Sequence, residues 1–282
     1  MTRPQTMPMP GNELKAEKMP GHWLLARLGK RVLRPGGREL TCQMIEALNI
    51  GPSDAVIEFA PGLGETARMA IDRKPASYTA VERDKNAAAM VQTILQGPNQ
   101  RCVVGLAEGT GLPDASATVV YGEAMLSMQT PLQKSRMIRE AHRLLMPKGR
   151  YGIHELCLTP DDLDDRIKQD IHNELSSTIH HGVRPLTSAE WRDLLEAEGF
   201  SVRTQARAAM HLLEPRRILQ DEGMIGALRF AFNLLSDRDA RRRVLAMRRA
   251  FSKYQDHLAA AVFVVEKKQE VTRSTTERPD EG

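Results

Sequence analysis

Two glycines and an acidic residue in the first third of the chain have the spacing of a nucleotide-binding turn. In VIEFAPGLGETARM, residues 56–69, Gly62, Gly64 and Ala67 fit the relaxed pattern G-x-G-x-x-A. Glu82 lies 20 residues beyond Gly62, where an acid can accept hydrogen bonds from ribose hydroxyls. Glycines in such a turn let the backbone approach a ligand closely, because they have no Cβ. The pattern predicts a nucleotide-like ligand, and NAD is one candidate.

Glu58 favours a ligand that carries positive charge. This acid stands near the end of an otherwise apolar segment, two residues before the loop. A dinucleotide pyrophosphate would bring like charge close to it, whereas S-adenosylmethionine carries an ammonium group and a sulfonium. Glu58 would then act near the methionine end, directly or through water, and Glu82 would accept both ribose hydroxyls. A structural role remains open for each acid, as a strand-end cap for Glu58 and as a helix-start acid for Glu82.

Short apolar runs alternate with helix-length segments around this turn. Two helices are predicted first, at 21–33 and 40–48. Strands follow at 55–59, 77–81, 101–104, 117–121 and 151–156, with helices at 65–73, 85–96 and 132–145. Beyond them, Thr187 and Glu190 have the spacing of a capping box that opens a helix, and 200–204 and 260–265 are predicted as strands. The alternation predicts an α/β fold, with a parallel sheet covered by helices on both faces.

The order of these segments resembles the class I S-adenosylmethionine-dependent methyltransferases, in particular the broad small-molecule group. The resemblance covers roughly residues 38–205 and the strand near 260–266. Four segments carry it together: VIEFAPGLGETARM, YTAVERD, GLAEGTGLPDASATVVYGEAML and IREAHRLLMPKGRYGIHEL. The resemblance implies a Rossmann-like sheet of seven mostly parallel strands, the last one antiparallel, and S-adenosylmethionine as the cofactor.

The resemblance also implies a cofactor site, position by position. The implied residues are Glu58, Ala60, Pro61, Gly62, Gly64 and Thr66 at the turn, Glu82 and Arg83 after the second strand, Ala107 and Glu108 on the adenine side, and Glu123 and Ala124 after the fourth strand. The sequence departs from the family at Leu106, where many relatives have an aspartate that bonds the adenine amino group, and at Thr118, which replaces a common acid. Glu108 or backbone groups would then supply the adenine contact, or the affinity would be lower.

Three histidines are candidate general bases for a methyl acceptor that must lose a proton. His154 ends the fifth predicted strand, and the adjacent His180 and His181 lie in the variable segment that forms a substrate wall in the resembled family. A strand histidine with satisfied partners and a solvated helix end are the structural alternatives. Trp23, Met125 and Met128 are candidate substrate-lining residues, although such side chains more often simply pack in a core. No metal site is expected, since neither the histidines nor the scattered cysteines have ligand spacing.

The composition divides the chain into six predicted parts. A flexible arm at 1–20 precedes a helical cap at 21–50, a methyltransferase core at 51–207, a helical insertion or lid at 208–258, the last core strand at 259–267 and a disordered tail at 268–282. The arm and the tail are assigned on their polar, proline-containing sequences. The lid is assigned because methyl transfer benefits from closure over the cofactor.

Length and charge restrict the class of protein without choosing a substrate. The 282 residues carry a net charge of +4 and 41% hydrophobic residues, and no apolar run approaches the about 20 residues needed to span a bilayer. We expect a cytoplasmic enzyme, a monomer or homodimer without a membrane partner, that methylates an O, N, S or C atom of a small molecule. An NAD(P)-dependent oxidoreductase and a relative without catalytic activity remain alternatives. A nucleic-acid-binding protein, suggested by the arginine-rich stretch at 236–254, is the less expected third.

Overall fold

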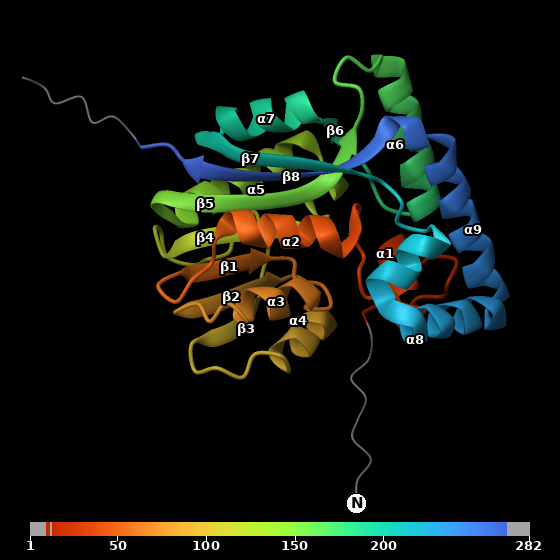
Figure 1. Ribbon diagram of the computed structural model, residues 1–282, viewed down its shortest axis with the longest axis horizontal. Helices are drawn as coiled ribbons and strands as arrows, with labels where there is room; N and C mark the ends of the chain where they lie inside the picture. Colours follow the sequence, from red (N-terminus) through yellow and green to blue (C-terminus); the bar gives the residue numbers. More distant parts are fainter. Residues whose placement is uncertain (1–9, 12, 270–282) are drawn as a thin grey trace, which may run out of the picture.

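A mixed β-sheet runs through the molecule (Figure 1). The computed structural model describes residues 10–11 and 13–269, so parts of the predicted arm and tail lie outside the described residues. The strand order is β3-β2-β1-β4-β5-β8-β7, and a short β6 pairs with β5. The strands are β1 Ala55–Phe59, β2 Ser77–Glu82, β3 Gln100–Val104, β4 Ala117–Glu123, β5 Leu145–Leu158, β6 Leu186–Thr187, β7 Phe200–Ala209 and β8 Leu258–Lys267.

The prediction of an antiparallel last strand is confirmed. β8 enters between β5 and β7 and runs antiparallel to both, whereas β1 to β5 pair in parallel. The α/β class is therefore confirmed as well, with the two-residue β6 added to the seven predicted strands. The carboxyl ends of β1 to β5 all point to the same edge of the sheet, where ligands bind in folds of this type.

Helices cover both faces of the sheet. The helices are α1 Gly21–Arg27, α2 Gly37–Leu48, α3 Glu65–Ile71, α4 Lys85–Gln92, α5 Pro131–Leu144, α6 Asp165–Ile179, α7 Ser188–Ala197, α8 Pro215–Ser236 and α9 Arg238–Lys253, with short 3-10 turns η1 Leu126–Met128 and η2 Gln255–His257. One apolar core joins α2, α3 and α4 to the sheet, and a second joins α5 and α7 to its other face. The capping box predicted at Thr187 and Glu190 opens α7.

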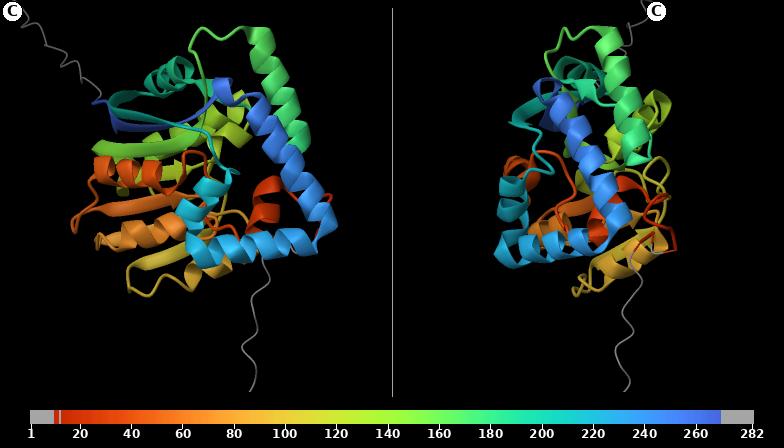
Figure 2. Two further views of the ribbon diagram at one scale, coloured as in Figure 1. Left: turned by 45° about the vertical axis from the view of Figure 1, so that its right-hand side comes forward. Right: turned by 90° about the vertical axis from the view of Figure 1, so that its right-hand side faces the viewer.

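A third apolar cluster lies beyond the carboxyl ends of the strands and joins α1, α6, α8 and α9 (Figure 2). We call these four helices the helical cover. α6 and α9 pack directly against each other, and α8 and α9 meet at Asp237. No helix among the described residues is long and apolar enough to cross a membrane.

Several elements differ from their predicted lengths, most of all β5, which begins at Leu145 instead of residue 151 and ends at Leu158 instead of 156. α1 ends at Arg27 instead of continuing to residue 33, because Gly29 adopts a φ of 104° and the Lys30 amide bonds back to the Leu25 carbonyl at 3.0 Å. The chain from there to Gly36 is an irregular linker. β7 continues five residues beyond its predicted end, to Ala209, because β8 pairs with it as far as that residue.

The described end of the N-terminal stretch packs against the cover. Met19 is fully buried in the cover's cluster, and the Ala16 carbonyl accepts a hydrogen bond from Arg243 at 2.6 Å. Residues 1–9 and 12, and the tail from 270, lie outside the described residues. The six-part division of the chain stays a prediction.

Glu58 is buried inside the sheet layer, where two tyrosines hold its carboxyl group. The Tyr121 hydroxyl donates to Glu58 Oε2 at 2.8 Å, and the Tyr78 hydroxyl donates to the same oxygen. All three side chains face α2 and α3, because alternate residues of β1 point to opposite faces of the sheet. Burial raises the pKa of Glu58 from 4.5 to about 7, although the two tyrosine hydrogen bonds oppose the rise.

We predict that Glu58→Gln stabilises the protein increasingly as the pH rises from about 4.5 to above 7. A carboxyl group with a raised folded-state pKa lowers stability once the unfolded chain can ionise, and the pKa separation corresponds to about 3 kcal/mol. Urea unfolding of Glu58→Gln and the wild type across this pH range measures the difference. Glu46→Gln, which changes an exposed acid on α2, should show a nearly constant difference. Parallel pH profiles for Glu58→Gln and the wild type would contradict the prediction.

Candidate functional site

A cavity of about 320 Å³ lies between the carboxyl ends of the strands and the helical cover. Loops after β1, β2, β3 and β4 form one side of it, and side chains of α1, α6 and α9 form the other. Of the predicted cofactor residues, those that line the cavity are Ala60, Gly62, Glu82, Arg83, Ala107, Glu108, Glu123 and Ala124. Glu58, Pro61, Gly64 and Thr66 lie outside its lining.

The glycine turn uses its two glycines for different purposes. Gly62 has a φ of 58°, and a Cβ there would meet nothing within 4 Å, so the backbone faces open space. Its amide donates to Glu82 Oε2 at 3.3 Å. Gly64 also has a positive φ, of 78°, but a Cβ there would lie 2.4 Å from the Ile94 side chain. Gly62 therefore leaves room for a ligand in the cavity, whereas Gly64 lets the turn pack closely against the chain that follows α4.

Glu82 presents a buried carboxylate at the cavity wall. Its Oε1 accepts the Asp84 amide at 3.0 Å, and Asp84 in turn caps α4. Burial raises the pKa of Glu82, and backbone hydrogen bonds from Asp84, Gly62 and Arg83 oppose the rise. A ligand with hydroxyl donors would add further hydrogen bonds to this carboxylate.

Glu108 supplies a second acid at the end of the cavity below β3. Its Oε2 is buried and, within the described part of the chain, accepts no hydrogen bond; Arg136 lies 4.0 Å away from it. Leu106, which stands at the position of the family's aspartate, is about half exposed at the cavity wall. A buried acceptor without a donor is costly, so Glu108 is suited to an amino group of a ligand.

Glu123 is the most strongly held acid of the site. Its carboxylate accepts from Thr41 at 2.6 Å and from Thr66, contacts His154 Nδ1 at 2.7 Å, and lies 3.4 Å from the Arg34 guanidinium. Burial alone would raise the pKa of Glu123, but Arg34 and the other partners lower it to about 2. The group is therefore an anion at neutral pH. Sequence reasoning missed Arg34, because the linker that carries it matches no motif.

His154 lies beneath the site and does not line the cavity. The ring is fully buried, its Nδ1 faces Glu123, and its Nε2 has no hydrogen-bond partner among the described residues. Thr66 likewise contacts Glu123 rather than the cavity. His154 and Thr66 therefore influence the cavity only through their contacts with the Glu123 carboxylate.

His181 is the one predicted histidine that lines the cavity, and His22 of α1 joins it there. Their ring centroids are 6.4 Å apart in an edge-on arrangement. Burial, followed by His181 and Arg83, lowers the pKa of His22 to about 4, and burial and Arg83 lower that of His181. Both rings are therefore neutral at pH 7. His180 is exposed at the end of α6, outside the cavity, so the adjacent histidines do not act as a pair.

Apart from His22 and His181, the cover side of the cavity is apolar, and Trp23 of α1 belongs to it. Met125 and Met128 line the cavity from the loop after β4. That these three side chains contact a substrate stays a prediction. Further apolar side chains come from distant parts of the chain: Leu25, Leu33, Ile179, Met210, Met247 and Phe251. Hydrophobic periodicity marked several of them as buried, but it did not show that they face a cavity.

Glu155 fixes the loop that carries the two methionines. Its carboxylate accepts the amides of Met125 at 3.0 Å, Leu126 at 2.8 Å and Ser127 at 2.9 Å, as well as the Ser127 hydroxyl at 2.7 Å. Such a set satisfies the free amides at the start of the η1 turn. Glu155 thus determines where Met125 and Met128 stand, a role that its place beside His154 in the sequence did not reveal.

The chain is similar to methyltransferases in sequence. The family model of a methyltransferase domain matches residues 56–149, which hold β1 to β4 and the cavity's strand-end acids. An uncharacterized protein from Haemophilus influenzae is 32% identical over 219 residues, covering 76% of this chain and 85% of that protein.

Solved structures share the fold. Haemonchus contortus phosphoethanolamine N-methyltransferase 2 in complex with S-adenosyl-L-methionine aligns with a TM-score of 0.67 at 14% identity, covering 88% of this chain and 57% of that one. The [4+2]-cyclase SpnF aligns with a TM-score of 0.64 at 17% identity, covering 88% of this chain and 93% of that one. With the strand order, the methyltransferase-domain match and the strand-end acids in agreement, the chain belongs to the class I S-adenosylmethionine-dependent methyltransferase family.

Proposed function

We propose that the protein binds S-adenosylmethionine along the carboxyl ends of β1 to β4 and transfers its methyl group to a small, largely apolar molecule. Three carboxylates at the cavity wall support this, namely those of Glu82, Glu108 and Glu123. Glu82 would hold the ribose hydroxyls, Glu108 the adenine amino group and Glu123 the positively charged methionine end. The Glu108 oxygen that accepts no hydrogen bond from the described residues, and the open space at Gly62, fit a ligand of this chemistry.

The anionic Glu123 disfavours a nicotinamide dinucleotide, whereas Glu82 would suit the ribose of either ligand. A pyrophosphate carries negative charge and would lie near Gly62, between Glu82 and the anionic Glu123. The cavity lining supplies one arginine, Arg83, and it is exposed.

The protein's own contribution to the reaction would be positioning, exclusion of water and proton removal. The cofactor supplies an already activated methyl group through its sulfonium. The apolar side chains of α1, α6 and α9 would exclude water and align the acceptor, which strengthens the electrostatic interactions inside the cavity. Glu123, held by Arg34 and His154, would stay anionic throughout; we assign His154 a positioning role through Glu123.

His181, with His22 beside it, is the proposed general base. It is neutral at pH 7 and lines the cavity on the cover side, whereas His154 is sealed beneath it. An acceptor hydroxyl or protonated amine must lose a proton to become a nucleophile, and a neutral imidazole can take it. The acceptor would thus be an apolar molecule with one protic heteroatom.

The basic face of α9 gives weaker support to nucleic-acid binding. Arg242 pairs with Glu17 and Asp239, and Arg243 is buried against backbone carbonyls. Arg248 and Arg249 remain exposed. No aromatic side chain lies between these arginines in the sequence, as base stacking would require.

We predict that Glu82→Ala weakens the binding of S-adenosylhomocysteine by at least about tenfold, since a charged acceptor of two ribose hydroxyls is lost. Calorimetric titration of the wild type with S-adenosylmethionine, S-adenosylhomocysteine and NADH gives the reference affinities. Glu46→Ala, on the exposed side of α2, is the matched control and should bind like the wild type. Wild-type binding of NADH alone would refute the proposed cofactor. Unchanged affinity in folded Glu82→Ala would refute the role of Glu82.

We predict that His181→Gln lowers kcat by about 10²-fold or more with a protic acceptor, while leaving S-adenosylhomocysteine affinity unchanged. Acceptors would be found by screening apolar phenols and amines with the radiolabelled cofactor. Because the pKa of His181 is lowered, wild-type kcat/KM should hold from neutral pH to below 6.5 and fall only as the base becomes protonated. His180→Gln, outside the cavity, serves as the control. Equal kcat and pH profile in His181→Gln would exclude it as the base.

A further inference from the structure

The second half of α8 exposes an apolar face that no described residue covers. Met224, Ile225, Leu228, Phe232 and Leu235 are each between 66% and 78% exposed. Their spacing places them on one side of a helix, because residues three, four and seven apart share a face. Single exposed apolar side chains are ordinary, but a continuous stripe of five marks an interaction surface. We call these five residues the α8 face.

The opposite side of this helix is packed, so the α8 face cannot simply turn inward. Phe230 is buried in the cover's cluster, and the Asn233 side chain donates to the Leu28 carbonyl at 3.0 Å. The helix also meets α9 directly. The exposure of the α8 face is thus a consequence of how the rest of the helix is held.

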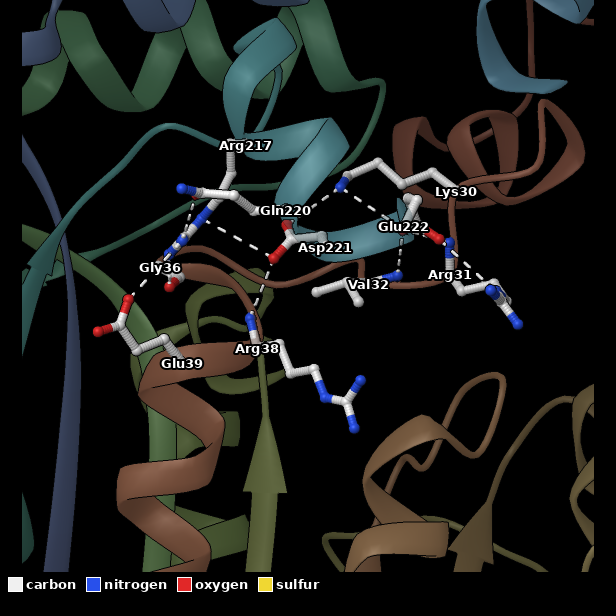
Figure 3. Close-up of polar contacts among 10 residues, drawn as sticks. All are labelled: Lys30, Arg31, Val32, Gly36, Arg38, Glu39, Arg217, Gln220, Asp221 and Glu222. Carbon is white, nitrogen blue, oxygen red and sulfur yellow. Dashed lines mark hydrogen bonds and ion pairs between the residues drawn. The ribbon is translucent and has the colours of Figure 1, made fainter. Parts of the chain in front are cut away.

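A buried ion cluster anchors the first half of α8 to the linker after α1 (Figure 3). Lys30, fully buried, lies 3.4 Å from Asp221 and 3.7 Å from Glu222. Glu222 also accepts the amides of Arg31 at 2.8 Å and Val32 at 2.9 Å. Breaking such a pair would leave an uncompensated charge in the interior, so the cluster holds this half of α8 against the linker.

Gly223 separates the anchored half from the apolar half. Its φ of 70° and ψ of 176° form a conformation that only glycine adopts readily. The chain therefore changes direction directly after the ion cluster and then resumes a helix with the α8 face outward. Both the anchor and the glycine fix that orientation.

Arginines surround the α8 face, and acids are absent from it. The segment MIGALRFAFNLLS, residues 224–236, contains one arginine and no acid. Arg229 lies beside the stripe, Arg31 lies at its start next to Glu222, and Arg238 follows its end; all three are exposed. The acids that flank the segment already have partners: Glu222 is buried against Lys30 and Arg31, Asp237 pairs with Arg27 at 3.2 Å and caps α9, and Asp239 pairs with Arg242 at 3.2 Å. Basic charge therefore predominates at the rim of the face.

We propose that the α8 face docks this protein onto an anionic phospholipid surface, with residues 224–236 lying in the plane of the interface. An apolar stripe with arginines at its edge matches the acyl boundary and the phosphate headgroups of a bilayer. The sequence predicted no membrane partner because it has no segment that could span a bilayer. Docking on the surface of a bilayer needs only one helix with an apolar face. The proposal does not depend on the cofactor.

A second copy of the chain fits the α8 face less well. A stable interface typically uses about 20–30 residues on each side, and the stripe offers five. A two-fold contact through one helix would also bring the arginines of the two copies together. An anionic bilayer has neither difficulty, since it supplies apolar depth and negative charge over a continuous surface.

Flotation of the full chain with vesicles tests the docking. We expect binding to vesicles of phosphatidylcholine and phosphatidylglycerol, and weaker binding to phosphatidylcholine alone. Ile225→Gln with Phe232→Gln should reduce binding by at least about tenfold, because the docked protein then has two fewer apolar side chains to bury in the bilayer. Leu132→Gln, at an exposed leucine of α5, is the matched control and should bind like the wild type.

The arginine rim has its own test. Arg229→Gln with Arg238→Gln should weaken binding to the mixed vesicles, and added salt should weaken wild-type binding in the same way. Binding that is independent of both would overturn the electrostatic part of the proposal. Thermal unfolding of each variant checks that the fold is intact, so that lost binding is assigned to the surface.

Three results would overturn the docking proposal. The wild type could fail to float with either vesicle, or Ile225→Gln with Phe232→Gln could float as the wild type does. In the third, light scattering would find a wild-type dimer that the same double variant dissociates, which would make the α8 face a contact between copies. Failure of S-adenosylhomocysteine binding would bear on the proposed function alone.

Discussion

The charge on Glu123 has to be compensated inside the protein, and the arrangement of the site depends on that requirement. Its partners come from the linker after α1, from α2, from α3 and from β5, so one carboxylate joins four separate parts of the chain. An isolated buried anion is costly, and removing any one partner would leave part of the Glu123 charge uncompensated. The linker that brings Arg34 to Glu123 also meets Asp221 and Glu222 of α8, which links the cavity floor to the helical cover.

Position along the strands, rather than the face of the sheet, decides which of these acids reach the cavity: Glu58, Glu82 and Glu123 share one face, but only Glu82 and Glu123 stand at the carboxyl edge. Glu58 precedes the glycine turn but points into the layer of α2 and α3, where tyrosines hold it. Glu82, Glu108 and Glu123 follow strand ends, and their carboxylates reach the cavity. The negative character of the site therefore comes from acids at the carboxyl edge of the sheet, and the acid of the first motif supports the turn from below.

The fold alone does not select a reaction. A [4+2]-cyclase and a phosphoethanolamine N-methyltransferase share this architecture at low identity, so the chemistry must be argued from the cavity. Here the sheet side is acidic and the cover side is apolar with two neutral histidines. The division suits a cationic cofactor on one side and an apolar acceptor on the other. The same cover that closes the cavity carries the exposed α8 face on its outside.

The sequence by itself determined the α/β class, the order of the strands along the chain, the capping box at Thr187 and the positions of the strand-end acids, because periodicity and capping are local signals. It did not reveal that His22 stands beside His181, that Arg34 reaches Glu123, or that Glu58 stays outside the cavity lining. Those contacts join residues far apart in the chain. Only the packing of the cover and linker against the sheet brings them together, and no local pattern encodes a contact that depends on how distant elements meet.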